Sequence, residues 1–387
     1  MSVPYWRLSG FYFFYFATVG CFVPYWSLYL KQSGFNSVEI GQLSALLLGT
    51  KIIAPNIWGW LADHTGKSIR IIRLASFFAA LLFAGFIFSQ SYLWFALITL
   101  AFSFFWNAVL PQFEAVTLFH LKEQAYRYSR IRLWGSVGFI IAVLGVGRLL
   151  DKEPIALLPF IVIALLTLSW IVTLLTPEAK VISYESVSVG LWQILKKPEL
   201  VAFLIVNILL QAAHSPYYVF YSIYLKHHQY SATVTGLLWA LGVVAEIVLF
   251  MYMGRLLKKT SLRKVLLFSI VLAIARWLLI AWYPDNLIVL TCAQLFHAAT
   301  FGAAHVTAIH FVHLYFGHQH QGKGQALYSS LSFGAGGVLG SLYSGYYWES
   351  LGGHFVYSIA ALLCGLAFII AYGWVGRKNT LNSRSLG

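Results

Sequence analysis

Residues 27–31 read Ser-Leu-Tyr-Leu-Lys and residues 222–226 read Ser-Ile-Tyr-Leu-Lys, so one pentapeptide returns 195 residues later with a single aliphatic exchange. The alignment continues beyond the pentapeptide, because Gly41 falls on Gly236 in the same register. The chain is therefore predicted to contain two copies of one unit in the same orientation. Whatever structure the first copy adopts must recur in the second.

Both copies are apolar enough to lie in a lipid bilayer. The 387 residues are 60% hydrophobic and 10% charged, with a mean hydropathy of +0.76, whereas soluble domains carry about 25% charged residues. A membrane-spanning helix needs roughly 20 mostly apolar residues, and at these lengths only a helix satisfies its own backbone in lipid. Twelve such runs are predicted, at about residues 8–30, 38–62, 69–89, 92–118, 132–150, 155–176, 199–225, 232–256, 263–283, 286–315, 325–348 and 354–376.

A polar stretch at residues 177–198 separates the sixth run from the seventh. Since the other connections are shorter, this stretch is predicted to be a cytoplasmic linker between residues 1–176 and residues 199–387. The expected fold class is an all-α integral membrane protein with twelve transmembrane helices in two pseudo-symmetric six-helix bundles. The second bundle is expected to end in a short cytoplasmic tail.

The basic residues behind the formal net charge of +14 are unevenly distributed between the two sides of the predicted spans. If both termini lie on one side, that side carries 20 of the 26 basic residues, the other side carries four, and two lie inside helices. Such a bias places both termini in the cytoplasm. The charge is then explained without nucleic acid, and the basic collar favours contact with anionic membrane lipid.

Residues that would indicate enzymatic or metal chemistry do not form a recognisable pattern. Cys21, Cys292 and Cys364 lie inside apolar runs without paired spacing, which predicts neither a disulfide nor a metal site. The histidines of the tenth run do not share one helical face, and no nucleophile elbow or phosphate-binding glycine loop is present. No cofactor, no metal and no enzymatic activity are therefore expected.

The loop after the second run reads Gly59-Trp60-Leu61-Ala62-Asp63-His64-Thr65-Gly66-Lys67. It resembles the loop between helices 2 and 3 of the major facilitator superfamily, in which glycine, acid, glycine and base recur at this spacing. Gly66 suits a tight turn, and Asp63 with Lys67 offers a charge pair that could form in one gate state and break in another. The alternative is an ordinary cytoplasmic turn. In the second copy Gly254 is retained, but Lys258 replaces the acid.

Charged side chains inside the spans are costly in lipid and are candidates for function. Glu114 and Glu246 are the carboxylates well inside apolar runs, and Lys51 and Arg276 are the cations. Arg132 opens the fifth run, where it could point inward or outward. In the repeat register Lys51 lies on Glu246, a coincidence that could bias the space between the halves or could join two unrelated positions.

The surroundings of these charges resemble two permease groups of the same superfamily. Pro111-Gln112-Phe113-Glu114-Ala115 followed by Arg132-Leu133-Trp134-Gly135-Ser136-Val137-Gly138 is similar to the lactose permease branch, whose acid and arginine form the sugar-binding ion pair. That branch's acid in helix 10 corresponds to Thr300 here, and its lysine in helix 11 has no match, which argues against lactose. The resemblance to the phenylpropionate permease family covers nearly the whole chain and is carried by Gln211-Ala212-Ala213-His214, Tyr217-Tyr218, Trp239, Gly242 to Glu246, Arg276-Trp277, His297 and His305.

These resemblances imply a proton-coupled importer in a bacterial inner (plasma) membrane, with a 3-phenylpropionate-type aromatic carboxylate as the first candidate substrate and a monomer as the working unit. A proton symporter for a sugar or nucleoside is the alternative, and a non-transporting membrane sensor is a third. Glu246 with Arg276, or Glu114 with Arg132, could supply the carboxyl and nearby cation that proton coupling needs. These pairs could equally be static ion pairs between helices. The residues expected to bind substrate are Glu114, Arg132, Lys51, Arg276, His214, Trp239 and Tyr217. The residues expected to couple protons are Glu246, Arg276, His297 and Glu114. The residues expected to gate are Gly59, Asp63, Gly66 and Lys67.

Overall fold

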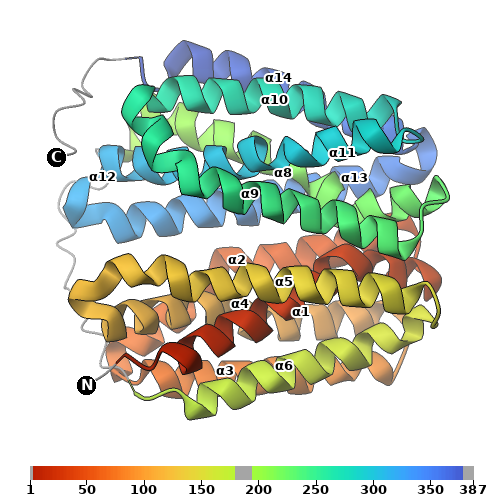
Figure 1. Ribbon diagram of the computed structural model, residues 1–387, viewed down its shortest axis with the longest axis horizontal. Helices are drawn as coiled ribbons and strands as arrows, with labels where there is room; N and C mark the ends of the chain where they lie inside the picture. The colour runs from red at the N-terminus through yellow and green to blue at the C-terminus, as the bar shows by residue number, and fades with distance from the viewer. Residues whose placement is uncertain (1–2, 179–193, 378–387) are drawn as a thin grey trace.

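A computed structural model describes residues 3–178 and 194–377. The described residues form long helices and short 3-10 or π segments joined by tight turns (Figure 1). The N-terminal half contains α1 (Tyr5–Gln32), α2 (Ser37–Thr65), α3 (Ser68–Phe83) with η1 (Ala84–Ile87), α4 (Tyr92–Leu121), η2 (Lys122–Arg127), α5 (Tyr128–Leu150), η3 (Ile155–Leu157) and α6 (Leu158–Leu175).

The C-terminal half repeats this order of spans. It contains α8 (Pro198–His227), α9 (Ala232–Lys259), α10 (Leu262–Trp282), α11 (Leu287–Leu295), η4 (Ala298–Ala303), α12 (Ala304–Ser329), η5 (Ser330–Gly336), α13 (Gly337–Leu351) and α14 (Gly353–Trp374).

Eleven of the described helices are long and apolar enough to cross a membrane. The remaining predicted span, the eleventh at 325–348, consists of the end of α12, the π segment η5 and the short helix α13. The protein is thus a multi-pass membrane protein with the predicted twelve-helix architecture. The division of the chain at residues 177–198 stays a prediction, because residues 179–193 lie outside the described part, as does the end of the predicted tail, 378–387.

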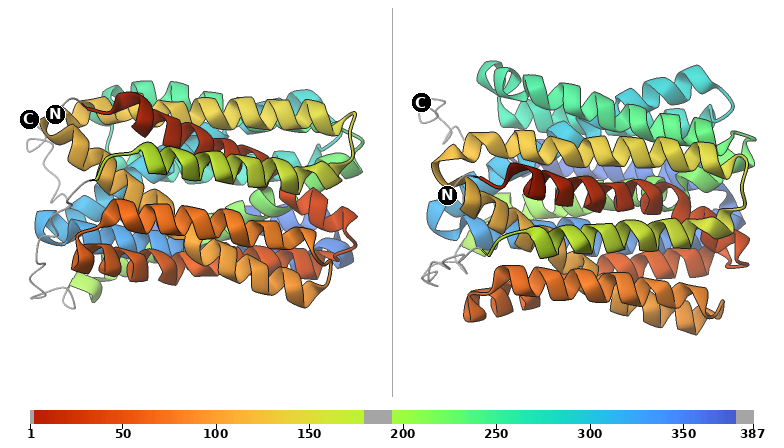
Figure 2. Two further views of the ribbon diagram at one scale, coloured as in Figure 1. Left: turned by 90° about the horizontal axis from the view of Figure 1, so that it is seen from below. Right: turned by 60° about the horizontal axis from the view of Figure 1, so that its bottom comes forward.

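The helices run side by side along the long axis of the molecule and form two stacked groups, one from each half (Figures 1 and 2). The start of α1 and the end of α14 lie at the same end of the molecule, which we call the terminal end, and we call the opposite end the distal end. The helix limits follow local signals. Asn36 and Glu39 form a capping box that starts α2, and Gly66 ends α2 in the left-handed conformation with φ of 63°.

Two spans of the second half depart from the regular helices that the sequence predicts. The run predicted at 286–315 is interrupted by the π segment Ala298–Ala303, and the run at 325–348 by the π segment Ser330–Gly336. Inside α12, Gly317 has a φ of 63° and breaks the helix between the predicted runs 286–315 and 325–348. A π segment adds a residue to a turn and rotates the side chains that follow, and such segments are frequent at functional sites.

The two halves pack tightly at the distal end. Helix α2 crosses α13 where Gly41 meets Gly345, and helix α5 crosses α9 where Gly147 and Gly236 meet the opposite backbone. A Cβ on Gly41 would lie 2.6 Å from the Ser341 carbonyl oxygen, and one on Gly236 would lie 2.7 Å from that of Val143. Only glycine allows backbones to approach this closely.

Tyr25 of α1 fixes the second crossing. Its hydroxyl lies 2.8 Å from the Val143 carbonyl oxygen of its own half and 3.3 Å from the Ala232 carbonyl oxygen of the other half. Tyr25 is fully buried. Because Gly41 and Gly236 are equivalent in the repeat, the distal end is closed by two equivalent helix crossings.

Candidate functional site

The C-terminal half holds a fully buried arginine in a polar network. Arg276 of α10 donates from one terminal nitrogen to His297 Nδ1 at 3.1 Å and to the Thr300 hydroxyl at 3.2 Å, and from the other toward Gln294 Oε1 at 3.5 Å. Its guanidinium carbon lies 4.4 Å from the centre of the Tyr217 ring. With 0% exposure, Arg276 has its charge dispersed over partners of its own half.

His297 connects this arginine to the nearby carboxylate. Because a guanidinium only donates hydrogen bonds, His297 Nδ1 must accept, and the proton of the neutral ring lies on Nε2. Nε2 faces Glu246 Oε2 of α9 at 3.8 Å, and the Glu246 side chain is 18% exposed. The pair Glu246 and Arg276 considered from the sequence is thus not a direct ion pair, since His297 lies between the two.

The other predicted residues of this half surround the network. His214 Nδ1 lies 2.7 Å from the Leu210 carbonyl oxygen of its own helix, and the His214 ring packs edge-on against Trp277. The Tyr217 hydroxyl donates to Gln294, and the Trp239 indole donates to the Ser222 hydroxyl. All three predicted side chains are at least 95% buried, so they form the wall of the network.

The N-terminal half presents its arginine differently. Arg132 lies in the second turn of α5, because this helix begins at Tyr128 rather than at the predicted residue 132. Its guanidinium carbon is 3.8 Å from the centre of the Phe16 ring of α1, so the side chain points inward. Within the described part of the chain, it makes no hydrogen bond or ion pair. Its N–H donors are therefore available to a ligand.

Glu114 of α4 does not form the ion pair with Arg132 that the resemblance to lactose permease implies. Glu114 Oε1 instead accepts a hydrogen bond of 3.1 Å from the Tyr128 hydroxyl. The Arg132 charge nevertheless acts on both Glu114 and Glu246, so it lies within electrostatic range of one carboxylate from each half.

Lys51 is the second available cation of this half. It follows Thr50, whose hydroxyl accepts from Asn107 of α4 at 2.8 Å and donates to the Ser103 hydroxyl at 2.9 Å. Lys51 itself is partly exposed and makes no hydrogen bond or ion pair with any residue that the structure describes.

Several relevant residues were not singled out as site residues from the sequence. Gln294 is completely buried, joins Arg276 to Tyr217, and donates to the Tyr221 hydroxyl at 2.7 Å. Its position three residues before His297 in an apolar run is a signal that could have identified it. Phe301 was missed too, and it stacks in parallel on His297 at 5.3 Å and on His305 at 6.1 Å. No local pattern could have placed Phe301, because the π segment sets its direction.

The gating motif lies at the terminal end. Gly66 forms the expected turn, and a Cβ on Gly59 would lie 3.4 Å from the Gln112 amide of α4. Asp63 and Lys67 make no ion pair in the described part of the structure. A 370 Å³ hollow beside this turn is lined by Thr65, Gly66, Lys67, Arg70 and Glu178.

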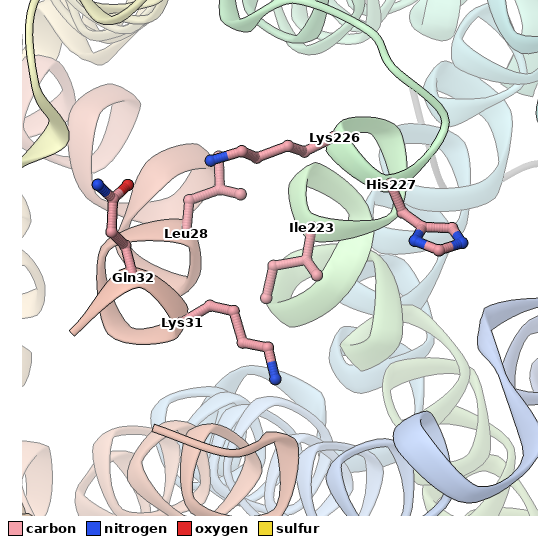
Figure 3. A pocket seen from close by; sticks show the side chains of 6 residues that line it. All are labelled: Leu28, Lys31, Gln32, Ile223, Lys226 and His227. Carbon is pink, nitrogen blue, oxygen red and sulfur yellow. The ribbon is translucent and has the colours of Figure 1, made fainter. Parts of the chain in front are cut away.

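A second hollow lies at the distal end, and none of the intramembrane charges lines it. It has a volume of 390 Å³ and is lined by Leu28, Lys31, Gln32, Ile223, Lys226 and His227, as Figure 3 shows. The two pentapeptides of the repeat supply four of these residues. No group of three or more metal-ligating side chains occurs among residues 3–178 and 194–377.

Two repeated helical bundles that cross a membrane and hold charged side chains between them define a transporter of the major facilitator type rather than an enzyme. The model of the family described as "MFS_1 like family" matches residues 5–359, and the chain belongs to this family.

Its relatives are permeases. The chain is 30% identical over 367 residues to the probable 3-phenylpropionic acid transporter of Escherichia coli, with 92% of this chain and 94% of that protein covered. It is 28% identical to the maltose permease of Geobacillus stearothermophilus, covering 88% and 86% of the two chains. The crystal structure of the nucleoside transporter NupG superposes with a TM-score of 0.82 at 18% identity, covering 97% of this chain and 98% of that one.

Proposed function

We propose that this protein imports a small aromatic carboxylate of the 3-phenylpropionate type together with a proton, by alternating access of a site between the two halves. The observation that carries the proposal is the contrast between its two arginines. Arg132 has uncommitted donors beside an aromatic ring, whereas both terminal nitrogens of Arg276 are hydrogen-bonded within its own half. The name of the Escherichia coli relative supplies the substrate class.

The substrate carboxylate would bind to the N-terminal half. A guanidinium with free donors can hold a carboxylate through two parallel hydrogen bonds. Of Arg132 and Arg276, the arginines singled out in the described spans, Arg132 is the one with such donors. Lys51 adds a second positive charge from α2 without a permanent partner. The substrate ring would face the C-terminal half, where Tyr218 and Phe301 are partly exposed. Aromatic side chains favour offset or edge-on contacts with such a ring.

The proton would bind to Glu246. No arginine or lysine of the described residues forms an ion pair with this carboxylate, and His297 directs an N–H toward it. A carboxylate without a permanent cation can be neutralised by a proton in one state and ionised in another. In the ionised state Glu246 attracts Arg132 across the two halves, and protonation removes this attraction. His297 then acts as a fixed donor, because Arg276 occupies its other nitrogen.

The basic-residue bias supports cytoplasmic termini and therefore a distal end on the opposite side of the membrane. The bacterial relatives support an inner-membrane location, in which the distal end is periplasmic. In this orientation the structure is closed toward the periplasm. We expect the protein to work as a monomer, since each half already supplies its part of the site within one chain.

A sugar or a nucleoside is the alternative substrate. The similarity to the maltose permease and the fold of the nucleoside transporter favour it, and Glu114 with Arg132 offers both acceptors and donors for hydroxyl groups.

Uptake of labelled 3-phenylpropionate into right-side-out vesicles under an inward proton gradient tests the proposal. Wild type should accumulate the label, an uncoupler should abolish accumulation, and Glu246→Gln should only equilibrate it. Arg132→Ala should bind the label about 100-fold more weakly. If wild type accumulates a sugar or nucleoside and ignores the aromatic acid, the substrate assignment is wrong while the transporter class stands.

A further inference from the structure

Two carboxylates at the distal end reach from one half to the first residues of a helix in the other half. Asp151 directly follows α5, and its two carboxylate oxygens accept hydrogen bonds from the Ala232 backbone N–H at 2.7 Å and the Thr233 backbone N–H at 3.1 Å. Ala232 and Thr233 are the first two residues of α9. The N-terminal half therefore caps a helix of the C-terminal half.

Glu349 makes the equivalent contact in the opposite direction. It lies near the end of α13, and its Oε1 accepts hydrogen bonds from the Ser37 backbone N–H at 3.1 Å and the Ser37 hydroxyl at 2.9 Å. Ser37 is the first residue of α2. Since the repeat places Ser37 on Ala232, both copies offer the same helix end to a carboxylate of the other half.

These contacts complete caps that each half leaves unfinished. The first N–H groups of a helix have no partner within the helix and form its positive end. In α9, Ser231 satisfies the N–H of Val234, and in α2, Asn36 satisfies that of Glu39. The amides of Ala232, Thr233 and Ser37 receive their partners from the opposite half.

Asp151 carries the charge that such a contact needs. Burial alone would raise the pKa of the Asp151 carboxyl, but hydrogen bonds from Thr233, Ala232 and Ser231 lower this pKa below its ordinary value. The carboxylate therefore stays ionised down to acidic pH. When the two halves separate, the ionised Asp151 carboxylate can leave the first residues of α9 without first taking up a proton.

We propose that Asp151 and Glu349 are paired positioning residues of the transport cycle, which together latch the distal face closed by capping α9 and α2 across the two halves. Separation of the distal ends breaks both caps at once, because each belongs to one of the two equivalent helix crossings. The latch is asymmetric. Lys31 donates to Glu349 at 2.7 Å, whereas its repeat equivalent Lys226 forms no ion pair with Asp151 in the described structure. Figure 3 shows the two lysines extending to different sides of the distal hollow.

The proposal rests on the transporter class and the proposed orientation, but its test needs no substrate. Single cysteines at two buried positions report opening of the two crossings: Ser341→Cys on α13 and Val143→Cys on α5, both fully buried now. They are placed in a chain whose three native cysteines are replaced by alanine. A membrane-impermeant maleimide is applied to right-side-out and to inverted vesicles, so that the side of access is measured rather than assumed.

The labelling rate from the distal side should rise about threefold in Asp151→Asn or Glu349→Gln, because each amide keeps an acceptor oxygen but removes the negative charge from the positive end of a helix. It should rise about tenfold in the double variant, since contacts without shared partners add. Asp151→Glu should restore part of the closure. Glu153→Gln, an exposed neighbour in the same loop, and Glu39→Gln, a cap within one half, should leave the rate unchanged.

A control for general unfolding uses the same latch variants with native Cys364 kept and without the added cysteines. Cys364 is fully buried in α14 and should stay unlabelled. If both probes keep the wild-type rate in the double variant, the latch is wrong. The same holds if Glu153→Gln raises the rate as much as Asp151→Asn. Failure of 3-phenylpropionate uptake would leave these results untouched.

Discussion

The two halves of this transporter hold their arginines in opposite ways. Arg276 in the C-terminal half is fully buried and donates to His297 and Thr300, while Arg132 in the N-terminal half is partly exposed and lies over Phe16. Both are basic residues in apolar helices, and nothing in that fact separates them. The difference teaches that a buried cation whose terminal nitrogens are hydrogen-bonded within its own half is part of the bundle, whereas one with free donors is ready for a ligand.

Arg276→Met gives the largest expected loss of stability in this comparison. The change leaves His297 Nδ1 and the Thr300 hydroxyl without their donor, which costs about 3 kcal/mol of unfolding free energy for two buried polar groups. Thermal unfolding of the purified protein in detergent should show a clear decrease in midpoint. Arg132→Met is the matched control and should unfold near the wild-type midpoint; equal losses would remove the distinction between the two arginines.

Arg132→Ala should give the largest loss of substrate binding. Two charge-assisted hydrogen bonds to a carboxylate disappear, which lowers affinity by about 100-fold or about 2.7 kcal/mol. Isothermal titration with 3-phenylpropionate measures the loss, and the matched variant Arg132→Lys should recover part of it. A wild-type affinity in Arg132→Ala would transfer the carboxylate site to Lys51 and call for the same titration of Lys51→Ala.

Glu246→Gln should separate binding from coupling. Its amide keeps the size of the carboxyl group next to His297 but carries no exchangeable acid proton, so accumulation should fall by about tenfold for each pH unit of gradient that wild type exploits. Exchange of labelled for unlabelled substrate should persist. Glu114→Gln is the matched change in the N-terminal half, where Tyr128 holds the carboxylate. If Glu114→Gln alone abolishes accumulation, the proton site lies in the other half.

Phe301→Leu should have the smallest effect. The stack of His297, Phe301 and His305 loses its central ring, and one aromatic contact contributes about 1 kcal/mol. Affinity for 3-phenylpropionate should fall about fivefold, while affinity for an alkyl carboxylate of similar length should stay the same. Competition of both acids against labelled substrate measures the difference. An equal decrease for both acids would show that Phe301 supports the fold rather than the ring.

The site was only partly predictable from sequence. The predicted intramembrane charges Glu114, Glu246, Lys51 and Arg276 are all present at mid-helix positions, because a charged residue in an apolar run is visible without knowledge of its neighbours. The predicted pairs of these charges were not found, since Tyr128 binds Glu114 and His297 faces Glu246. A helical pattern gives the face of a side chain, but the π segments of the second half rotate that face.

The sequence by itself determined the class, the number of spans, the repeat and the residues available for charge and proton chemistry. Hydropathy and chain length act locally, and the bilayer requires every span to satisfy its own backbone. The tertiary structure alone decided which charges meet, which arginine is free, and how Asp151 and Glu349 close the distal end. These choices depend on contacts between helices far apart in the chain, where a shift of a few ångströms replaces an ion pair by a hydrogen bond to a neutral side chain.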